Sequence, residues 1–166
     1  FNSLSVWENL FLSSLRCQPQ GLSEWGFLFS AASQKKIRKN CLEAMRGVGL
    51  EKDWKTVTSE LSYGSKRMLE IGISFSLKPK LLLLDEPLSG LSDVEIVEIL
   101  EILNRIKKNL TLIIIEHKLS RIVNLVDRLC VMNEGSFICE GEPERVLNDQ
   151  KVRECYWGKG ELTMEG

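Results

Sequence analysis

Two acidic side chains follow a run of four leucines in "LLLLDEP", residues 81–87. Proline stands on both sides of this run, which predicts a strand buried on both faces, as in a parallel sheet. Asp85 and Glu86 then lie at the carboxyl end of the strand, the edge where open α/β sheets bind ligands. An aspartate there can hold Mg²⁺, and the glutamate can polarise a water. The alternative is a polar strand end that only caps a helix.

The single histidine, His117, ends a second apolar run, "TLIIIEH" at residues 111–117, which also predicts a buried strand. A lone histidine at a strand end is either a structural residue or a participant in chemistry. Because two predicted strands both deliver polar side chains to one sheet edge, the second interpretation gains weight.

A serine and a glycine precede a predicted helix in "LSYGSKRMLEIG", residues 61–72. Ser62 and Gly64 stand just ahead of an apolar-periodic stretch that predicts a helix from Ser65. The stretch is either an ordinary helix start or a phosphate site, because a helix N-terminus offers free N–H groups and the positive end of the helix dipole.

Helices and strands alternate along the chain, which predicts an α/β layered fold. The Ser5/Glu8 and Ser92/Glu95 spacings are capping boxes that start helices, and Glu134-Gly135 predicts a hairpin turn. One helical face carries Ile37, Cys41, Met45 and Val48, and two short helices are expected near residues 143–148 and 152–156. We expect a helical subdomain over residues 1–78, a catalytic core portion over 79–142, and C-terminal helices and tail over 143–166.

The composition of the 166 residues is that of an ordinary globular protein, with 43% hydrophobic and 27% charged residues. The formal net charge of −1 gives no support for a nucleic-acid or anionic-membrane binder. Five cysteines without a CxxC pair favour reduced thiols over a disulfide framework or a zinc site. No apolar run approaches membrane-spanning length.

Four motifs in a fixed order resemble one family. The segments "LSYGS", "LLLLDEP", "SGLSD" and "IIIEH" are similar to the signature motif, Walker B strand, D-loop and switch histidine of ABC-type ATPases. The resemblance implies the C-terminal part of a P-loop NTPase core with an α-helical subdomain. The tail "EGEPERVLNDQKVRECYWG" resembles ATPase subunits of importers for branched-chain amino acids and related amides, and "LSVWENL" resembles the segment after their Q-loop.

The resemblance implies ATP and Mg²⁺ as cofactors and assigns a role to each motif. Asp85 would hold magnesium through water, Glu86 would be the general base, and His117 would contact the γ-phosphate. ATP bound mainly by a partner subunit would be contacted by Leu61, Ser62, Tyr63, Gly64 and Ser65. The dimer seam would be lined by Ser89, Gly90, Leu91, Ser92 and Asp93.

The sequence departs from the family pattern at several positions. Tyr63 stands where a second glycine is usual, Ser65 where glutamine is usual, and Ser92 where an acidic or amide residue is usual. The printed sequence contains no GxxxxGK[ST] stretch, the loop whose backbone and lysine bind phosphates. We therefore expect the P-loop strand to be missing from this chain, and the chain alone to be inactive.

The function implied is an ATP-hydrolysing subunit of an importer for branched-chain or related amino acids. Its partners would be a second ATPase subunit, transmembrane permease subunits and, indirectly, a solute-binding protein, with no nucleic acid. It would lie peripherally on the cytoplasmic face of the cell membrane. The alternatives are a non-catalytic module that lends its signature motif to a partner's ATP, and an ABC ATPase of DNA repair or translation.

Four aromatic residues of the helical subdomain could either fill its core or form the surface that receives a helix of a permease subunit: Trp7, Trp25, Phe27 and Phe29.

Overall fold

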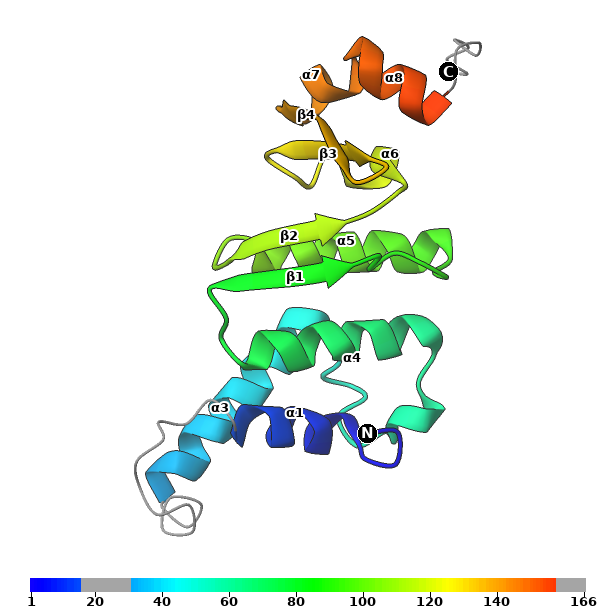
Figure 1. Cartoon of the computed structure of the whole chain (residues 1–166). Coiled ribbons are helices and arrows are strands. Elements are labelled where there is room, and N and C mark those ends of the chain that lie inside the picture. The colour runs from blue at the N-terminus through cyan, green and yellow to red at the C-terminus, as the bar shows by residue number, and fades with distance from the viewer. Residues whose placement is uncertain (16–30, 158–166) are drawn as a thin grey trace. The chain divides into compact units, whose positions relative to one another are not determined.

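The computed structural model describes residues 1–15 and 31–157 (Figure 1). The chain divides into two compact units, Phe1–Glu116 and His117–Gly166. The first unit contains most of the residues singled out in the sequence, and the second begins at the histidine.

Three helices of the first unit pack against one another: α1 (Val6–Leu15), α3 (Ala31–Val48) and α4 (Tyr63–Ser76). A short 3-10 turn, Thr58–Glu60, precedes α4. Helix α3 ends before Gly49, which has a φ of +75°, and the N–H of Leu50 donates to the carbonyl of Met45, a common helix terminator. The predicted apolar face is confirmed, since its four members are almost fully buried: Ile37, Cys41, Met45 and Val48.

The rest of the first unit is a strand–helix–strand element: β1 (Leu81–Asp85), α5 (Asp93–Ile106) and β2 (Thr111–Ile115). The strands are parallel, with Leu81 opposite Thr111 and Asp85 opposite Ile115. Helix α5 is amphipathic, and Ile99 and Leu103 are completely buried on its inner face. Both strands therefore end at the same edge of the pair, as the sequence predicted.

The predictions that β1 is buried on both faces and that β2 is a buried strand are both wrong. Leu82 is buried, whereas Leu83 is 67% exposed and Ile115, on the neighbouring strand, is 62% exposed. Successive side chains of a strand point to opposite faces, and the crossover helix of a strand–helix–strand element packs on one face only. Within the described part of the first unit, residues 1–15 and 31–116, no layer therefore covers the other face of β1 and β2.

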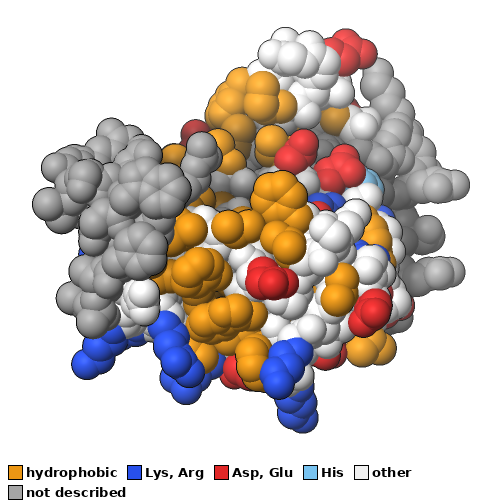
Figure 2. All heavy atoms as spheres, turned by 90° about the horizontal axis from the view of Figure 1, so that it is seen from below, with side chains coloured by type: hydrophobic (Ala, Val, Ile, Leu, Met, Phe, Trp, Pro, Cys, Tyr) orange, Lys and Arg blue, Asp and Glu red, His pale blue; other side chains and the backbone are white. Residues whose placement is uncertain are grey.

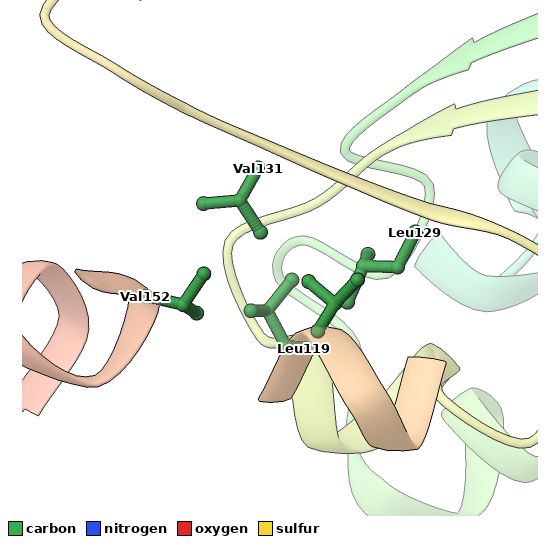
Figure 3. Packing of buried hydrophobic residues seen from close by; sticks show 5 residues of the cluster. Leu119, Leu129, Val131 and Val152 are labelled. Atoms are coloured by element: carbon green, nitrogen blue, oxygen red, sulfur yellow. The ribbon is translucent and has the colours of Figure 1, made fainter. Parts of the chain in front are cut away.

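The second unit contains the hairpin of β3 (Leu129–Asn133) and β4 (Ser136–Gly141), with α6 (Leu119–Ile122), α7 (Pro143–Leu147) and α8 (Gln150–Trp157). Glu134 and Gly135 both have positive φ, as a two-residue hairpin turn requires, which confirms the predicted turn. The core of this unit draws on one or two residues from β3 and each helix (Figure 3): Leu119, Leu129, Val131, Val146 and Val152.

Candidate functional site

The carboxyl end of β1 carries the two acidic candidates. Asp85 is the last residue of the strand, Glu86 follows it directly, and both side chains are exposed. The backbone of Glu86 is left-handed, with a φ of +43°, which is uncommon for a residue other than glycine. The structure thus places both carboxylates at the expected sheet edge and turns the chain sharply at the second one.

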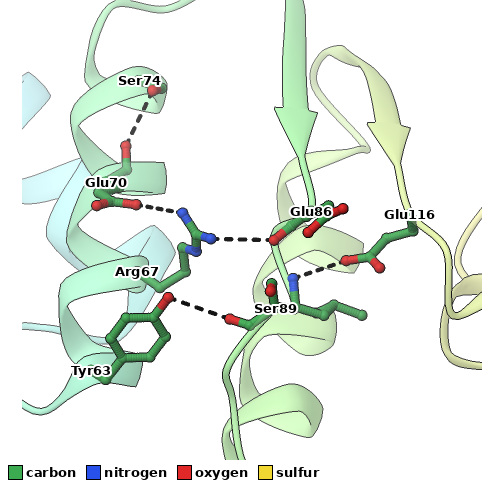
Figure 4. A network of polar contacts seen from close by, with 8 residues as sticks. Tyr63, Arg67, Glu70, Ser74, Glu86, Ser89 and Glu116 are labelled. Carbon is green, nitrogen blue, oxygen red and sulfur yellow. Dashed lines mark hydrogen bonds and ion pairs between the residues drawn. The ribbon is translucent and has the colours of Figure 1, made fainter.

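Backbone hydrogen bonds fix the turn after β1. The N–H of Glu86 donates to the carbonyl of Ile115 at 2.9 Å, and the N–H of Ser89 donates to the carbonyl of Glu86 at 3.1 Å. Glu116, just past the end of β2, accepts the N–H of Leu88 through its carboxylate at 2.9 Å (Figure 4). The turn that presents Glu86 is therefore held by the neighbouring strand and its next residue.

The start of helix α4 differs from the prediction. The helix begins at Tyr63 rather than Ser65, and Ser62 is its N-cap, with its hydroxyl oxygen accepting the N–H of Ser65 at 3.1 Å. The N–H of Gly64, expected to be free, donates to the carboxylate Oε1 of Glu95 at 3.1 Å. The helix start is firmly capped, and a carboxylate already occupies one of its N–H groups.

The segment after the turn lies against the start of α4. The hydroxyl of Tyr63 donates to the carbonyl of Ser89 at 3.4 Å. Gly90 has a φ of +74°, and a side chain there would meet the Tyr63 ring at 3.2 Å. The structure thus brings residues 61–65 and residues 89–93 together within one unit, although the intervening residues 66–88 separate them in the chain.

Ser92 and Glu95 form the predicted capping box at the start of α5. Serine is as good an N-cap as aspartate or asparagine. Although Ser92 departs from the family pattern, it therefore still caps helix α5. Hydrogen bonds from the hydroxyl and the N–H of Ser92 hold the pKa of Glu95 below its ordinary value of 4.5, and the N–H of Gly64 lowers that pKa further. Glu95 is therefore ionised near neutral pH, and its carboxylate joins the two helix starts.

Three residues of this region were missed in the sequence as contributors to the site. Glu95 was recognised only as part of a local capping box. Arg67 and Glu116 lie within "LSYGSKRMLEIG" and "IIIEH", but the sequence assigned them no role. The contacts of Arg67 and Glu116 with the turn after β1 join residues 19 and 28 positions apart in the chain. No local pattern in the sequence could have indicated them.

His117 opens the second unit and is exposed. The predicted strand ended at His117, whereas β2 ends at Ile115, so the histidine lies two residues beyond the strand. Its contact with a phosphate stays a prediction.

Of the four aromatic candidates, Trp7 lies within the described residues. Trp25, Phe27 and Phe29 lie outside the described residues. Trp7 is half-buried and lines a cleft of about 470 Å³ with Leu42, Met45 and Trp54. Figure 2 views the molecule from the side of the first unit's helices and shows hydrophobic side chains gathered on this face, with Lys and Arg side chains along its lower edge. Trp7 therefore faces a surface cleft instead of filling the core.

Among residues 1–15 and 31–157, no group of three or more His, Cys, Asp or Glu side chains could hold a metal ion. No helix in these ranges is both long and apolar enough to cross a membrane.

Comparisons with known proteins agree with this geometry. The sequence profile of the family described as ABC transporter matches residues 1–89. The high-affinity branched-chain amino acid transport ATP-binding protein LivG of Escherichia coli K12 is 29% identical over 165 residues, covering 96% of this chain and 64% of LivG. The chain therefore spans a little under two thirds of the length of this relative.

Solved structures of ATP-binding cassettes share the fold. The ADP conformation of MJ1267, an ATP-binding cassette of an ABC transporter, is 28% identical with a TM-score of 0.74, over 95% of this chain and 64% of that one. CbiO1 of Clostridium perfringens, part of the ABC transporter complex cbiONQ, is 28% identical with a TM-score of 0.74, over 90% and 55%. The predicted ABC ATPase fold is thus confirmed. The chain belongs to the ABC transporter family.

Proposed function

We propose that the protein is the ATP-binding and ATP-hydrolysing subunit of an ABC importer for branched-chain or related amino acids. The observation that carries the proposal is the hydrogen bond from the Tyr63 hydroxyl to the Ser89 carbonyl, which joins residues 61–65 to residues 89–93 beside the turn that presents Glu86. Similarity to LivG, which is named for branched-chain amino acid transport, supports the solute class.

Glu86 is proposed as the general base that takes a proton from the attacking water. Its carboxylate is exposed at the end of β1, beyond a turn held by hydrogen bonds, so it is accessible to a nucleotide. Asp85 would hold Mg²⁺ through water. A single carboxylate suits this ion, which keeps several waters and takes its remaining ligands from substrate phosphates. When bound, Mg²⁺ would neutralise charge on the phosphates.

The start of α4 is proposed to contact ATP held by a second subunit. Ser62 is exposed at the helix N-terminus, where the dipole favours an anion, and its hydroxyl would have to exchange its bond to the Ser65 hydroxyl for a phosphate oxygen. The N–H of Gly64 would have to exchange the carboxylate of Glu95 for a phosphate oxygen. His117 would contact the γ-phosphate, and residues 89–93 would line the seam between the two ATPase subunits.

The cleft beside Trp7 is proposed to receive a helix of a permease subunit. Its lining combines Trp7, Leu42, Met45 and Trp54 with the charged Arg38, Arg46 and Glu51, which suits an amphipathic helix. CbiO1 is described as part of a transporter complex, which supports a partner of this kind. The protein would then act at the cytoplasmic face of the membrane, with a solute-binding protein as an indirect partner.

Substitution of the proposed base tests the function. In the product of the complete gene, purified with its permease subunits, Glu86→Gln should lower ATP turnover roughly 10²–10⁴-fold, because general base catalysis contributes about that much. The variant should still bind ATP and accumulate an ATP-loaded dimer. Glu98→Gln, on the exposed side of α5, is the matched control and should leave turnover unchanged.

Two outcomes would redirect the proposal. Unchanged turnover in Glu86→Gln would remove Glu86 as the base. A wild-type protein that forms ATP-dependent dimers without turnover would instead be a non-catalytic module that lends residues 61–65 to its partner. Loss of leucine uptake on deleting the gene, with ribose uptake intact, would support the solute class.

A further inference from the structure

The backbone of Glu86 is strained and tightly held. A left-handed conformation at a residue other than glycine is energetically unfavourable and persists only where the surroundings determine it. Here the N–H of Glu86 bonds to β2, and its carbonyl accepts the N–H of Ser89. One further contact to the same carbonyl comes from outside the strands and the turn.

That contact is made by Arg67 of helix α4. Its Nη2 donates to the carbonyl of Glu86 at 3.2 Å, while its Nη1 pairs with the carboxylate of Glu70 at 2.9 Å (Figure 4). The Arg67 side chain is only 26% exposed. A planar guanidinium can hold two acceptors in fixed directions at once, which a lysine ammonium does less well. The bond therefore constrains the direction of the Glu86 peptide as well as its position.

Arg67 lies one helical turn after Tyr63, on the same face of α4. Both side chains reach the segment after β1, Tyr63 at the carbonyl of Ser89 and Arg67 at the carbonyl of Glu86. The N-terminus of this helix carries Ser62 and Gly64. One rigid helix thus connects the proposed phosphate contact to the backbone of the proposed base.

We infer that Arg67 is a positioning residue that sets the backbone of Glu86 from helix α4. This inference rests on the proposed function and deepens it. In the proposed dimer, residues 61–65 contact the nucleotide of the partner, whereas Glu86 acts on the nucleotide of its own subunit. The bond from Arg67 to Glu86 then links the two nucleotide sites within one chain, so that a shift of α4 at one site moves the base at the other.

The test compares Arg67→Met, Arg67→Lys and the control Glu70→Gln in the product of the complete gene. Glu70→Gln removes the ion pair of Arg67 but leaves its bond to the Glu86 carbonyl. We expect Arg67→Met to lower kcat for ATP roughly 10–100-fold, since small displacements of a catalytic group have effects of this size. KM for ATP should change less than about threefold, because binding groups stay in place. Arg67→Lys should recover part of kcat, and Glu70→Gln should lose less than about twofold.

A double-mutant cycle separates positioning from a general loss of structure. If Arg67 acts through Glu86, adding Arg67→Met to Glu86→Gln should lower the residual turnover no further. The inference would be overturned if the losses of turnover in Arg67→Met and Glu86→Gln multiplied fully in the double variant. Equal losses of turnover in Arg67→Met and Glu70→Gln would also overturn it.

Amide hydrogen exchange of the nucleotide-free protein gives a measurement independent of ATPase activity. Arg67→Met and Arg67→Lys should each speed exchange of the Glu86 and Ser89 amides, because both substitutions disturb the turn after β1. Glu70→Gln leaves the bond from Arg67 to the turn and should not change their exchange. Unchanged exchange in both Arg67 variants would overturn the inference even if the protein hydrolyses ATP. Faster exchange in a protein that hydrolyses no ATP would keep the contact and reject the proposed function.

Discussion

Helices α4 and α5 begin with the same serine cap and differ at the third helical residue. Ser62 has φ −59° and ψ 164°, Ser92 has φ −69° and ψ 162°, and each hydroxyl oxygen accepts the N–H three residues on. In α5 that third residue is Glu95, whose carboxylate returns to the N–H of Ser92 and completes the capping box. In α4 it is Ser65, which accepts only a weak contact from the Ser62 hydroxyl at 3.1 Å.

Helix α4 obtains its missing carboxylate from its neighbour. One oxygen of Glu95 serves the start of α5, and the other accepts the N–H of Gly64 in α4. Helix α4 has no acid in its own first turn, so the N–H of Gly64 obtains its acceptor from another helix. The segment proposed to bind nucleotide and the segment proposed to line the dimer seam therefore share one carboxylate, through Gly64 and Ser92, so a change at either one reaches the other.

The largest effect on this arrangement is expected from Gly64→Ala. A Cβ at this position would lie 2.5 Å from Oε1 of Glu95, so the carboxylate must leave and the buried N–H loses its partner. We expect the free energy of unfolding, measured in urea on the product of the complete gene, to fall by about 1–3 kcal/mol. Alanine ordinarily stabilises a helix relative to glycine, so the predicted sign is the opposite of the usual one.

The Glu95→Ala background provides the control for Gly64→Ala. With the carboxylate removed, the added methyl group has no such clash, and Gly64→Ala should become neutral or stabilising. An equal cost in both backgrounds would show that Glu95 is not the group that requires glycine at position 64.

Removing the serine N-caps of α4 and α5 should lower the free energy of unfolding by different amounts. Loss of a serine N-cap costs roughly 0.5–2 kcal/mol. We expect Ser62→Ala near the lower end of this range and Ser92→Ala near the upper end, because Ser92 also holds the carboxylate that α4 uses. The measurement is again the free energy of unfolding in urea.

Ser92→Thr keeps a hydroxyl and should recover most of the stability lost in Ser92→Ala. Equal costs for Ser62→Ala and Ser92→Ala would contradict the shared role of Glu95.

The smallest effect is the pH dependence of the Glu95 contact. The pKa of Glu95 is lowered by its hydrogen bonds, so its contribution to stability is present above the ordinary value of 4.5 and is lost as the pH falls through the folded-state pKa. The difference in unfolding free energy between wild type and Glu95→Gln should be constant from about pH 8 to about pH 5 and shrink below that. The pKa of Glu8 is also lowered, but Glu8 is common to both proteins and cancels. If the difference in unfolding free energy persisted unchanged at low pH, the stabilisation could not come from the ionised carboxylate of Glu95.

The helices could be predicted from the sequence because their signals are local. The capping boxes at Ser5 and Ser92, the apolar stripe of α3 and the turn at Glu134-Gly135 were all confirmed. Burial of β1 was predicted wrongly, because four leucines in a row fit a strand covered on two faces or on one. Burial depends on which layers pack against a strand, and the strand's own residues do not specify them.

The residue types that could do chemistry, their order and the sheet edge of Asp85 and Glu86 could be read from the chain, because they follow from short-range rules of strand and helix formation. The bond of Glu95 to the N–H of Gly64 and the bond of Arg67 to the carbonyl of Glu86 depend on how the helices and strands pack. Such contacts join residues far apart in the chain through hydrogen bonds of fixed geometry, and packing alone brings their partners within reach.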